Sequence, residues 1–157
     1  MQFPDPWLEI SETERPGRGF ANSDACVIDN KWFFVRGCIE IAIVDMDELF
    51  VWGAWVSLSA ESFERVKELW TASALENEPV KFGWLCNRIP VYPDTYALRA
   101  NVRLRNDNLR PLIELHRSDH PLAVEQHQGI TRARVEEIVS AMIHGMKSAS
   151  DPIREDS

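Results

Sequence analysis

A chain of 157 residues, 45% of them hydrophobic, can bury roughly 70% of its unfolded surface in one core, so its stability requires neither a disulfide nor a bound metal. The net charge of -8, from 25 acidic and 17 basic residues, disfavours general binding to a phosphate backbone. Three cysteines without a Cys-x-x-Cys pattern, and no apolar run of membrane-spanning length, predict a protein of the reducing cytoplasm that binds neither zinc nor a membrane.

Residues 1–23 form the first segment of the predicted organisation. They are rich in proline and acidic residues, which indicates an irregular arm with a short helix near Pro6 to Glu14. One α+β domain is expected over residues 24–146, and it begins with a short strand at 25–28. A polar tail is expected over residues 147–157.

Residues 31–58 predict two long strands joined by a short acidic turn, because apolar residues alternate along each half. In the first half one face is apolar and the other is mixed. In the second half both faces are apolar, which is typical of a central strand that is covered above and below. The core face of the first half carries Phe33, Val35, Gly37, Ile39, Ile41 and Ile43.

The remaining elements alternate between helices and strands. Ser59 is a suitable cap for a helix that ends near Thr71, and Thr131 caps a second amphipathic helix that ends near Gly145. Strands are predicted over 80–87, 95–105 and 111–115, with a short helix or turn over 122–126. The adjacent strands are close enough in sequence for hairpins. This order predicts a mainly antiparallel α+β sheet with two main helices packed on one face.

Candidate chemistry is sparse. The densest group of imidazoles and carboxylates comprises His116, Asp119, His120, Glu125 and His127, but Pro121 interrupts any helix that would bring them to one face. We therefore interpret them as solvated loop residues or as residues whose hydrogen bonds order the loop, and we predict no metal ligand, no catalytic residue and no cofactor. The cysteines lie in strand patterns and are interpreted as buried, inert thiols.

Five arginines between residues 99 and 117 form a local exception to the acidic character of the chain. Only Asp107 and Glu114 oppose them in that segment. Within this segment, the arginines at positions 99, 103 and 105 form a row that suits nucleic-acid binding by charge alone. Because the net charge is negative, we interpret them instead as a solvated strand face or as contacts to acidic groups.

Six tryptophans are many for this length. Most fall within or beside the predicted core, yet together they exceed what one helix-covered face requires. We therefore expect the second face of the sheet, around Trp32, Phe34 and Cys38, to be covered by the N-terminal arm or by another chain.

Several long strings, in order, resemble one known family: FFVRGCIEI, FVWGAWVSLS, FGWLCNRIPVYPDT, RPLIELHRSDHPLAVEQHQGIT and the terminal helix. The sequence from about Asp24 to Gly145 is similar to the uncharacterised bacterial domain-of-unknown-function family numbered twenty-one ninety-nine. The resemblance implies a single cytoplasmic bacterial domain without an established activity. Many members of that family begin with a Cys-x-x-Cys-Gly segment typical of a zinc ribbon. This sequence has no counterpart before Asp24, and the resemblance supplies no catalytic residue.

Two functional hypotheses remain. The first is a non-enzymatic interaction or regulatory module that binds another protein or a second copy of itself, because apolar surface exceeds one core and no nucleophile–base pattern is present. The alternative is a small-molecule-binding protein or hydrolase. Its binding site is predicted at Trp84, Asn87, Tyr92, Asp94, Asp119 and His120, with the aromatic rings stacking a ligand and Asp119 or His120 handling protons.

Overall fold

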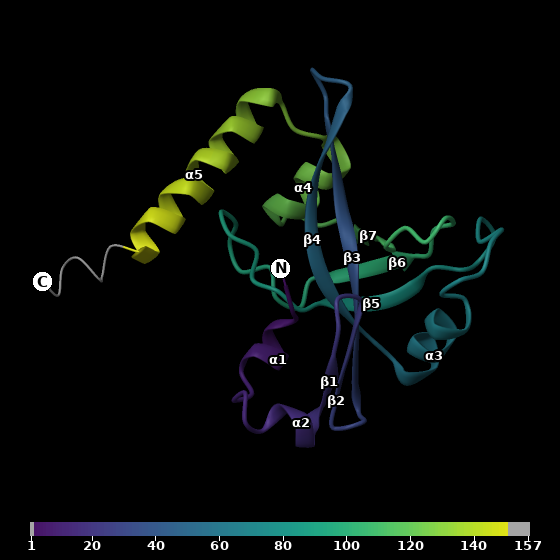
Figure 1. Ribbon diagram of the computed structural model, residues 1–157. Coiled ribbons are helices and arrows are strands. Elements are labelled where there is room, and N and C mark those ends of the chain that lie inside the picture. The colour runs from purple at the N-terminus through teal and green to yellow at the C-terminus, as the bar shows by residue number, and fades with distance from the viewer. Residues whose placement is uncertain (1, 151–157) are drawn as a thin grey trace, which may run out of the picture.

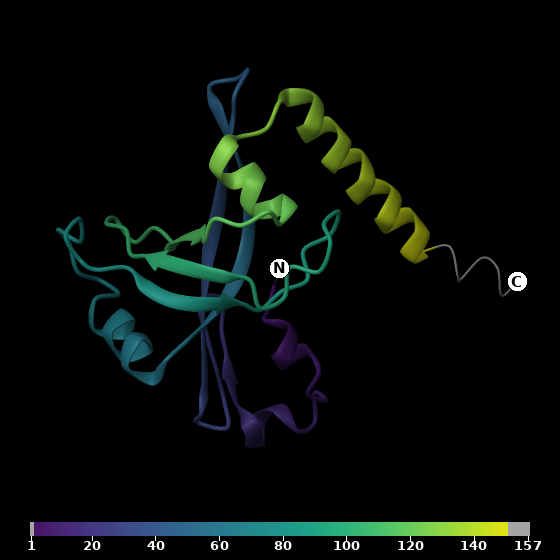
Figure 2. The same cartoon turned by 180° about the vertical axis from the view of Figure 1, so that it is seen from behind.

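The computed structural model describes residues 2–150 and shows a closed β-barrel with peripheral helices (Figures 1 and 2). The strands are β1 (Gly19–Ala21), β2 (Ala25–Ile28), β3 (Trp32–Ile43), β4 (Glu48–Leu58), β5 (Lys81–Leu85), β6 (Arg99–Arg103) and β7 (Leu112–Leu115). The helices are α1 (Asp5–Leu8), α2 (Arg15–Arg18), α3 (Ala60–Glu68), α4 (Pro121–Gln128) and α5 (Arg132–Ser150). Each strand pairs antiparallel with the next one in the chain.

One parallel pair closes the barrel. Cys38 of β3 pairs with Leu112 of β7, so that β3 to β7 form a ring of five strands. The Cys38 backbone nitrogen donates to the Pro111 carbonyl at 2.9 Å. Gly37 permits this approach, because a Cβ at that position would lie 2.7 Å from the same carbonyl oxygen and 2.8 Å from Cγ1 of Ile113. β1 and β2 extend the sheet outside the ring, along the first half of β3.

The predicted α+β sheet with two main helices on one face is therefore wrong. Alternation of apolar residues shows which face of a strand is buried, and it does not show whether the sheet stays open or closes on itself. The helices also form no common layer. Helix α3 packs against β3 and β4, whereas α5 extends away from the barrel (Figures 1 and 2).

Helix α5 differs from its sequence prediction in a second way. It begins at Arg132, directly after the predicted cap Thr131, but it continues through Gly145 to Ser150. The first four residues of the predicted polar tail are thus helical, and residues 151–157 lie outside the described part of the chain. Among residues 2–150 no helix has the length and apolar character that a membrane crossing requires.

The long hairpin was predicted correctly. β3 and β4 pair from Phe33 with Leu58 to Ile43 with Glu48, and a loop of four residues joins them. Its inner face contributes to the main core, in which Val35, Ile39, Ile41, Ala54 and Val56 are almost fully buried. The expectation that the second strand is covered on both faces holds for only part of it. Trp55 lies in a second core on the outer face of β4, whereas Leu49 and Val51 on the same face are 55% and 46% exposed.

Candidate functional site

The second core joins the N-terminal arm to the outside of the barrel. Trp7 and Ile10 of the arm pack with a cluster formed by β2, β3, β4 and the end of β5. The partner residues are Cys26, Ile28, Phe34, Trp55 and Cys86. The arm, rather than another chain, therefore covers Phe34. It does not cover Trp32, whose side chain is 53% exposed.

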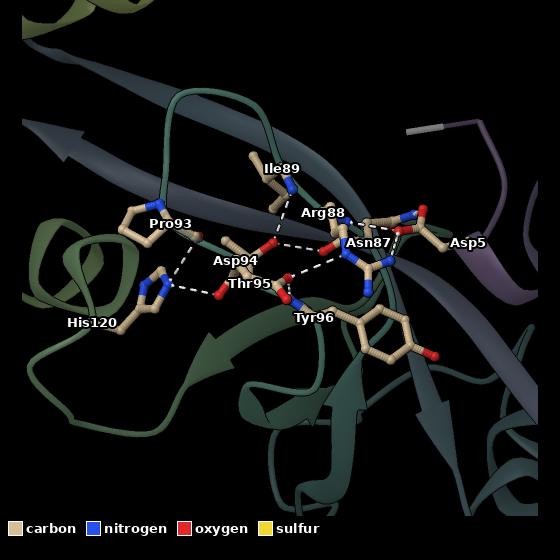
Figure 3. A network of polar contacts seen from close by, with 9 residues as sticks. All are labelled: Asp5, Asn87, Arg88, Ile89, Pro93, Asp94, Thr95, Tyr96 and His120. Atoms are coloured by element: carbon tan, nitrogen blue, oxygen red, sulfur yellow. Dashed lines mark hydrogen bonds and ion pairs between the residues drawn. The ribbon is translucent and has the colours of Figure 1, made fainter.

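A buried amide attaches the arm to this surface (Figure 3). Asn87 accepts a hydrogen bond from the Trp55 backbone nitrogen through Oδ1 (2.8 Å). Its Nδ2 donates to the Phe3 carbonyl (2.9 Å) and to Oδ1 of Asp5 (3.2 Å). The Asp5 backbone nitrogen in turn donates to the Cys86 carbonyl (2.8 Å). Asn87 is 1% exposed, so all its polar atoms serve the fold.

An open cleft of about 560 Å³ lies between the arm and the barrel. The arm contributes one wall and strands β3 to β5 contribute the floor. The residues that line it are Pro6, Glu9, Ile10, Glu14, Arg18, Ile28, Asp29, Trp32, Phe34, Ser57, Trp84, Leu85, Cys86, Tyr96 and Ala97. Trp32 and Trp84 keep 53% and 42% of their surface exposed there, so the cleft presents large aromatic groups to solvent.

The charged groups of the cleft leave it negative. Arg18 and Asp29 form a bidentate pair, with Nη2 of the arginine 2.8 Å from Oδ2 of the aspartate. This pair lowers the pKa of Asp29 and raises that of Arg18, through hydrogen bonding above all. Glu9 and Glu14 are exposed, and within residues 2–150 neither forms an ion pair. Two carboxylates without a cation therefore border an aromatic floor.

The thiols of the second core are poor nucleophiles. Burial raises the pKa of Cys26 to about 12 and that of Cys86 to about 11. The Cys86 thiol donates to the Trp84 carbonyl at 3.2 Å. A thiol that stays protonated at neutral pH cannot attack a carbonyl carbon efficiently. Although Cys86 lines the cleft, it does not make the cleft a thiol active site.

We expect these two thiols to resist alkylation in the folded protein. In a Cys38→Ser variant near pH 8, where an ordinary thiol is partly ionised, iodoacetamide should label the unfolded chain at least about a hundredfold faster than the native chain. Mass spectrometry after timed quenching measures both rates. Native labelling of Cys86 at the rate of the unfolded chain would contradict the assigned protonation.

The six predicted binding residues do not form one site. Asn87 is buried beneath the arm, whereas Trp84 lies on the cleft wall. Tyr92 packs edge-on against Trp52, whose Nε1 donates to its hydroxyl at 3.4 Å, and burial raises its pKa to about 12. Asp119 is exposed beyond β7. Trp84 and Tyr92, which were predicted to stack one ligand, thus lie in different parts of the structure.

Only Asp94 and His120 meet, and they do so through the backbone (Figure 3). His120 caps α4 by accepting from the Leu122 nitrogen at Nδ1 (3.1 Å), so the ring proton is on Nε2. That nitrogen lies 3.2 Å from the Pro93 carbonyl and 3.1 Å from the Asp94 carbonyl. His120 therefore fixes the 88–96 loop to α4. Both of its ring nitrogens are engaged in hydrogen bonds to the backbone.

The loop itself is held by buried Thr95. Its hydroxyl donates to the Asn87 carbonyl (2.6 Å) and accepts from the Ile89 nitrogen (2.9 Å). Asp94 accepts from the Tyr96 nitrogen (2.9 Å), which completes a tight turn (Figure 3). Sequence reasoning placed this loop near His120 correctly but assigned chemistry to groups that are structural.

Other histidines of the predicted cluster are also engaged in the fold. His127 Nε2 lies 2.6 Å from the Leu115 carbonyl, and His116 Nε2 lies 2.9 Å from Oδ1 of Asn101. Glu125 pairs with Arg134 at 2.8 Å. Within residues 2–150 no three metal-binding side chains converge on one point.

Sequence reasoning missed the carboxylates of the cleft. Glu9 and Glu14 belong to an arm that has no strong pattern, and nothing local shows that it folds back onto the barrel. The excess of tryptophan was the one available signal. It predicted an aromatic face around Trp32, Phe34 and Cys38, and Trp32 and Phe34 do line the cleft, but it did not identify the carboxylates.

The fold and the cleft define a small closed β-barrel that carries an N-terminal arm and an open aromatic groove, without a recognisable catalytic constellation in the described residues. The chain belongs to the bacterial family described as "Uncharacterized protein conserved in bacteria (DUF2199)", which matches residues 1–130. The match includes the arm and ends before α5, whereas the resemblance seen in the sequence began at about Asp24 and included α5. Comparison with curated proteins and with solved structures gave no match.

Proposed function

We propose that this protein is a non-enzymatic binding module, and that the cleft between arm and barrel binds a segment of a partner protein. The observation that carries the proposal is the pair of half-exposed tryptophans, Trp32 and Trp84, on the floor of a groove that charged residues border. Aromatic side chains in a groove are typical anchors of protein interfaces. The raised pKa values of the neighbouring thiols favour binding over catalysis.

The charge of the cleft indicates the chemistry of the partner. Glu9 and Glu14 border the aromatic floor, and the Arg18–Asp29 pair is neutral overall. A segment with one apolar or aromatic anchor and adjacent lysine or arginine residues would cover the tryptophans and neutralise both carboxylates. We further propose that binding takes place in the cytoplasm, which the unpaired state of all three cysteines supports.

Selection from a phage-displayed random peptide library on the full chain tests this function. We expect enriched peptides to contain an aromatic or branched residue flanked by basic residues. Replacement of Trp32 by serine should weaken binding of such a peptide about thirtyfold, as loss of an interface hot spot does. A Glu9→Gln and Glu14→Gln double variant should remove most of the salt dependence.

Trp70→Ser is the matched control, because Trp70 is 41% exposed and lines different hollows. Equal losses for Trp32→Ser and Trp70→Ser, or enrichment of acidic peptides, would overturn the proposal. Light scattering of the purified chain tests whether a second copy of the protein occupies the cleft. A dimer that Trp32→Ser dissociates would assign the cleft to a second copy instead.

A further inference from the structure

The arginines between residues 99 and 117 are not equivalent in the structure. Three of them are neutralised by carboxylates on neighbouring elements. These pairs are Arg103 with Glu114 (2.8 Å), Arg105 with Glu40 (2.9 Å) and Arg110 with Asp24 (3.2 Å). Contacts to acidic groups, one of the two interpretations of the row at residues 99, 103 and 105, are therefore found for Arg103 and Arg105.

Arg99 and Arg117 remain without a carboxylate partner among the described residues. Both line one hollow of about 420 Å³ where β6 begins and β7 ends, together with His116 and Ser118. The rest of its lining is Ala97, Leu98, Leu115 and Ala123. No acidic residue borders the hollow. A protein of net charge -8 thus has a positive recess where the two arginines of the 99–117 segment that lack a carboxylate partner in the described structure meet.

Exposed aromatic rings adjoin this recess. Phe82 and Trp84 project from the same face of β5, two residues apart, and are 45% and 42% exposed. The Arg99 guanidinium lies 5.5 Å from the Trp84 ring centroid, and the His116 ring lies 5.6 Å from that of Phe82. Two residues that line the hollow therefore also contact the rings. β5, β6 and β7 lie side by side in this part of the barrel (Figures 1 and 2).

Guanidinium groups bind phosphate oxygens through paired N–H donors, and the Ser118 hydroxyl can supply a further donor. Aromatic side chains such as Phe82 and Trp84 stack on planar bases. We propose that the hollow binds the phosphate of a mononucleotide whose base stacks on Trp84, while the Phe82 ring, at 86° to that of Trp84, borders the base from the side. A long phosphate chain fits less well, since the rest of the protein would repel it. This site adjoins the cleft through Trp84 but uses different charged residues.

Isothermal titration calorimetry of the full chain with adenosine 5′-monophosphate tests the proposal. Separate titrations with inorganic phosphate and with adenosine measure the binding of each half of the nucleotide. We expect the nucleotide to bind at least about tenfold more tightly than either half. Arg99→Gln and Arg117→Gln should each weaken nucleotide binding about tenfold and leave adenosine binding nearly unchanged. Trp84→Leu should weaken nucleotide and adenosine binding alike.

Arg103→Gln is the matched control, because its side chain on the same strand is already paired with Glu114. Trp32→Ser, which tests the cleft, should leave nucleotide affinity unchanged, so the two proposals can fail separately. No heat from the nucleotide, equal losses for Arg103→Gln and Arg117→Gln, or tighter binding of a single-stranded oligonucleotide than of the mononucleotide would each overturn the assignment.

Discussion

Replacement of Trp55 by alanine is expected to lower the free energy of unfolding by about 4 kcal/mol. Trp55 is 0% exposed and lies in the second core, beneath the arm and on the outer face of β4. Its ring centroid is 6.3 Å from that of Phe3. Loss of the indole would leave a cavity that the paired strands on both sides of β4 cannot close.

Denaturant unfolding followed by far-ultraviolet circular dichroism measures this loss. Trp70→Ala serves as the comparison, because a tryptophan that is 41% exposed should contribute less than about 2 kcal/mol. If both variants lose similar stability, the second core does not stabilise the fold as the burial of Trp55 indicates.

The hairpin could be predicted from the sequence because its signal is local. Both β3 and β4 have an apolar residue at every second position, and β4 begins after a loop of four residues. Ser59 likewise accepts a hydrogen bond from the Ser62 nitrogen at the start of α3, as its position before a helical pattern predicted.

Closure of the barrel could not be predicted in the same way. It depends on one parallel pair between residues distant in the chain, Cys38 and Leu112, and on the space that Gly37 leaves for Pro111. In the sequence, a glycine at that position is equally compatible with an ordinary core residue in a strand of an open sheet. The apolar stripe of α5 led, for a related reason, to the wrong prediction that this helix packs with another on one face of the sheet. Amphipathicity shows that a helix has an apolar face, but among residues 132–145 of α5, whose burial is described, only Ile138 is fully buried.

The candidate site was only partly predictable because polar residues beside aromatic ones serve folding as readily as binding. Asn87 and His120 were chosen for their chemistry, and both are occupied in holding backbone segments together. Conversely, Arg99 and Arg117 could not be distinguished from their neighbours in sequence. Only the three-dimensional arrangement shows which arginines of the row have carboxylate partners.

The second large effect is expected at Asn87. Alanine at this position should cost about 3 kcal/mol, since it removes the side-chain oxygen that accepts from the Trp55 backbone nitrogen and the side-chain nitrogen that donates to the Phe3 carbonyl. The arm should also detach more often, which amide hydrogen exchange of residues 3–10 would report as faster exchange. Arg88→Ala is the control. Its guanidinium joins Asp5 at 3.5 Å on the surface, with 59% of the side chain exposed, so its loss should cost under about 1 kcal/mol.

Asn87→Asp separates the two halves of this contact. Aspartate keeps the oxygen that accepts from the Trp55 nitrogen, but it replaces the Nδ2 donor with an oxygen that faces the Phe3 carbonyl and the Asp5 carboxylate. Near neutral pH we therefore expect faster exchange in the arm while the barrel amides stay protected. Burial and the facing oxygens raise the pKa of the new carboxyl in the folded state. Its destabilising effect should consequently diminish as the pH falls and the group is protonated. Equal exchange of arm and barrel at every pH would show that Asn87 does not attach the arm as the geometry indicates.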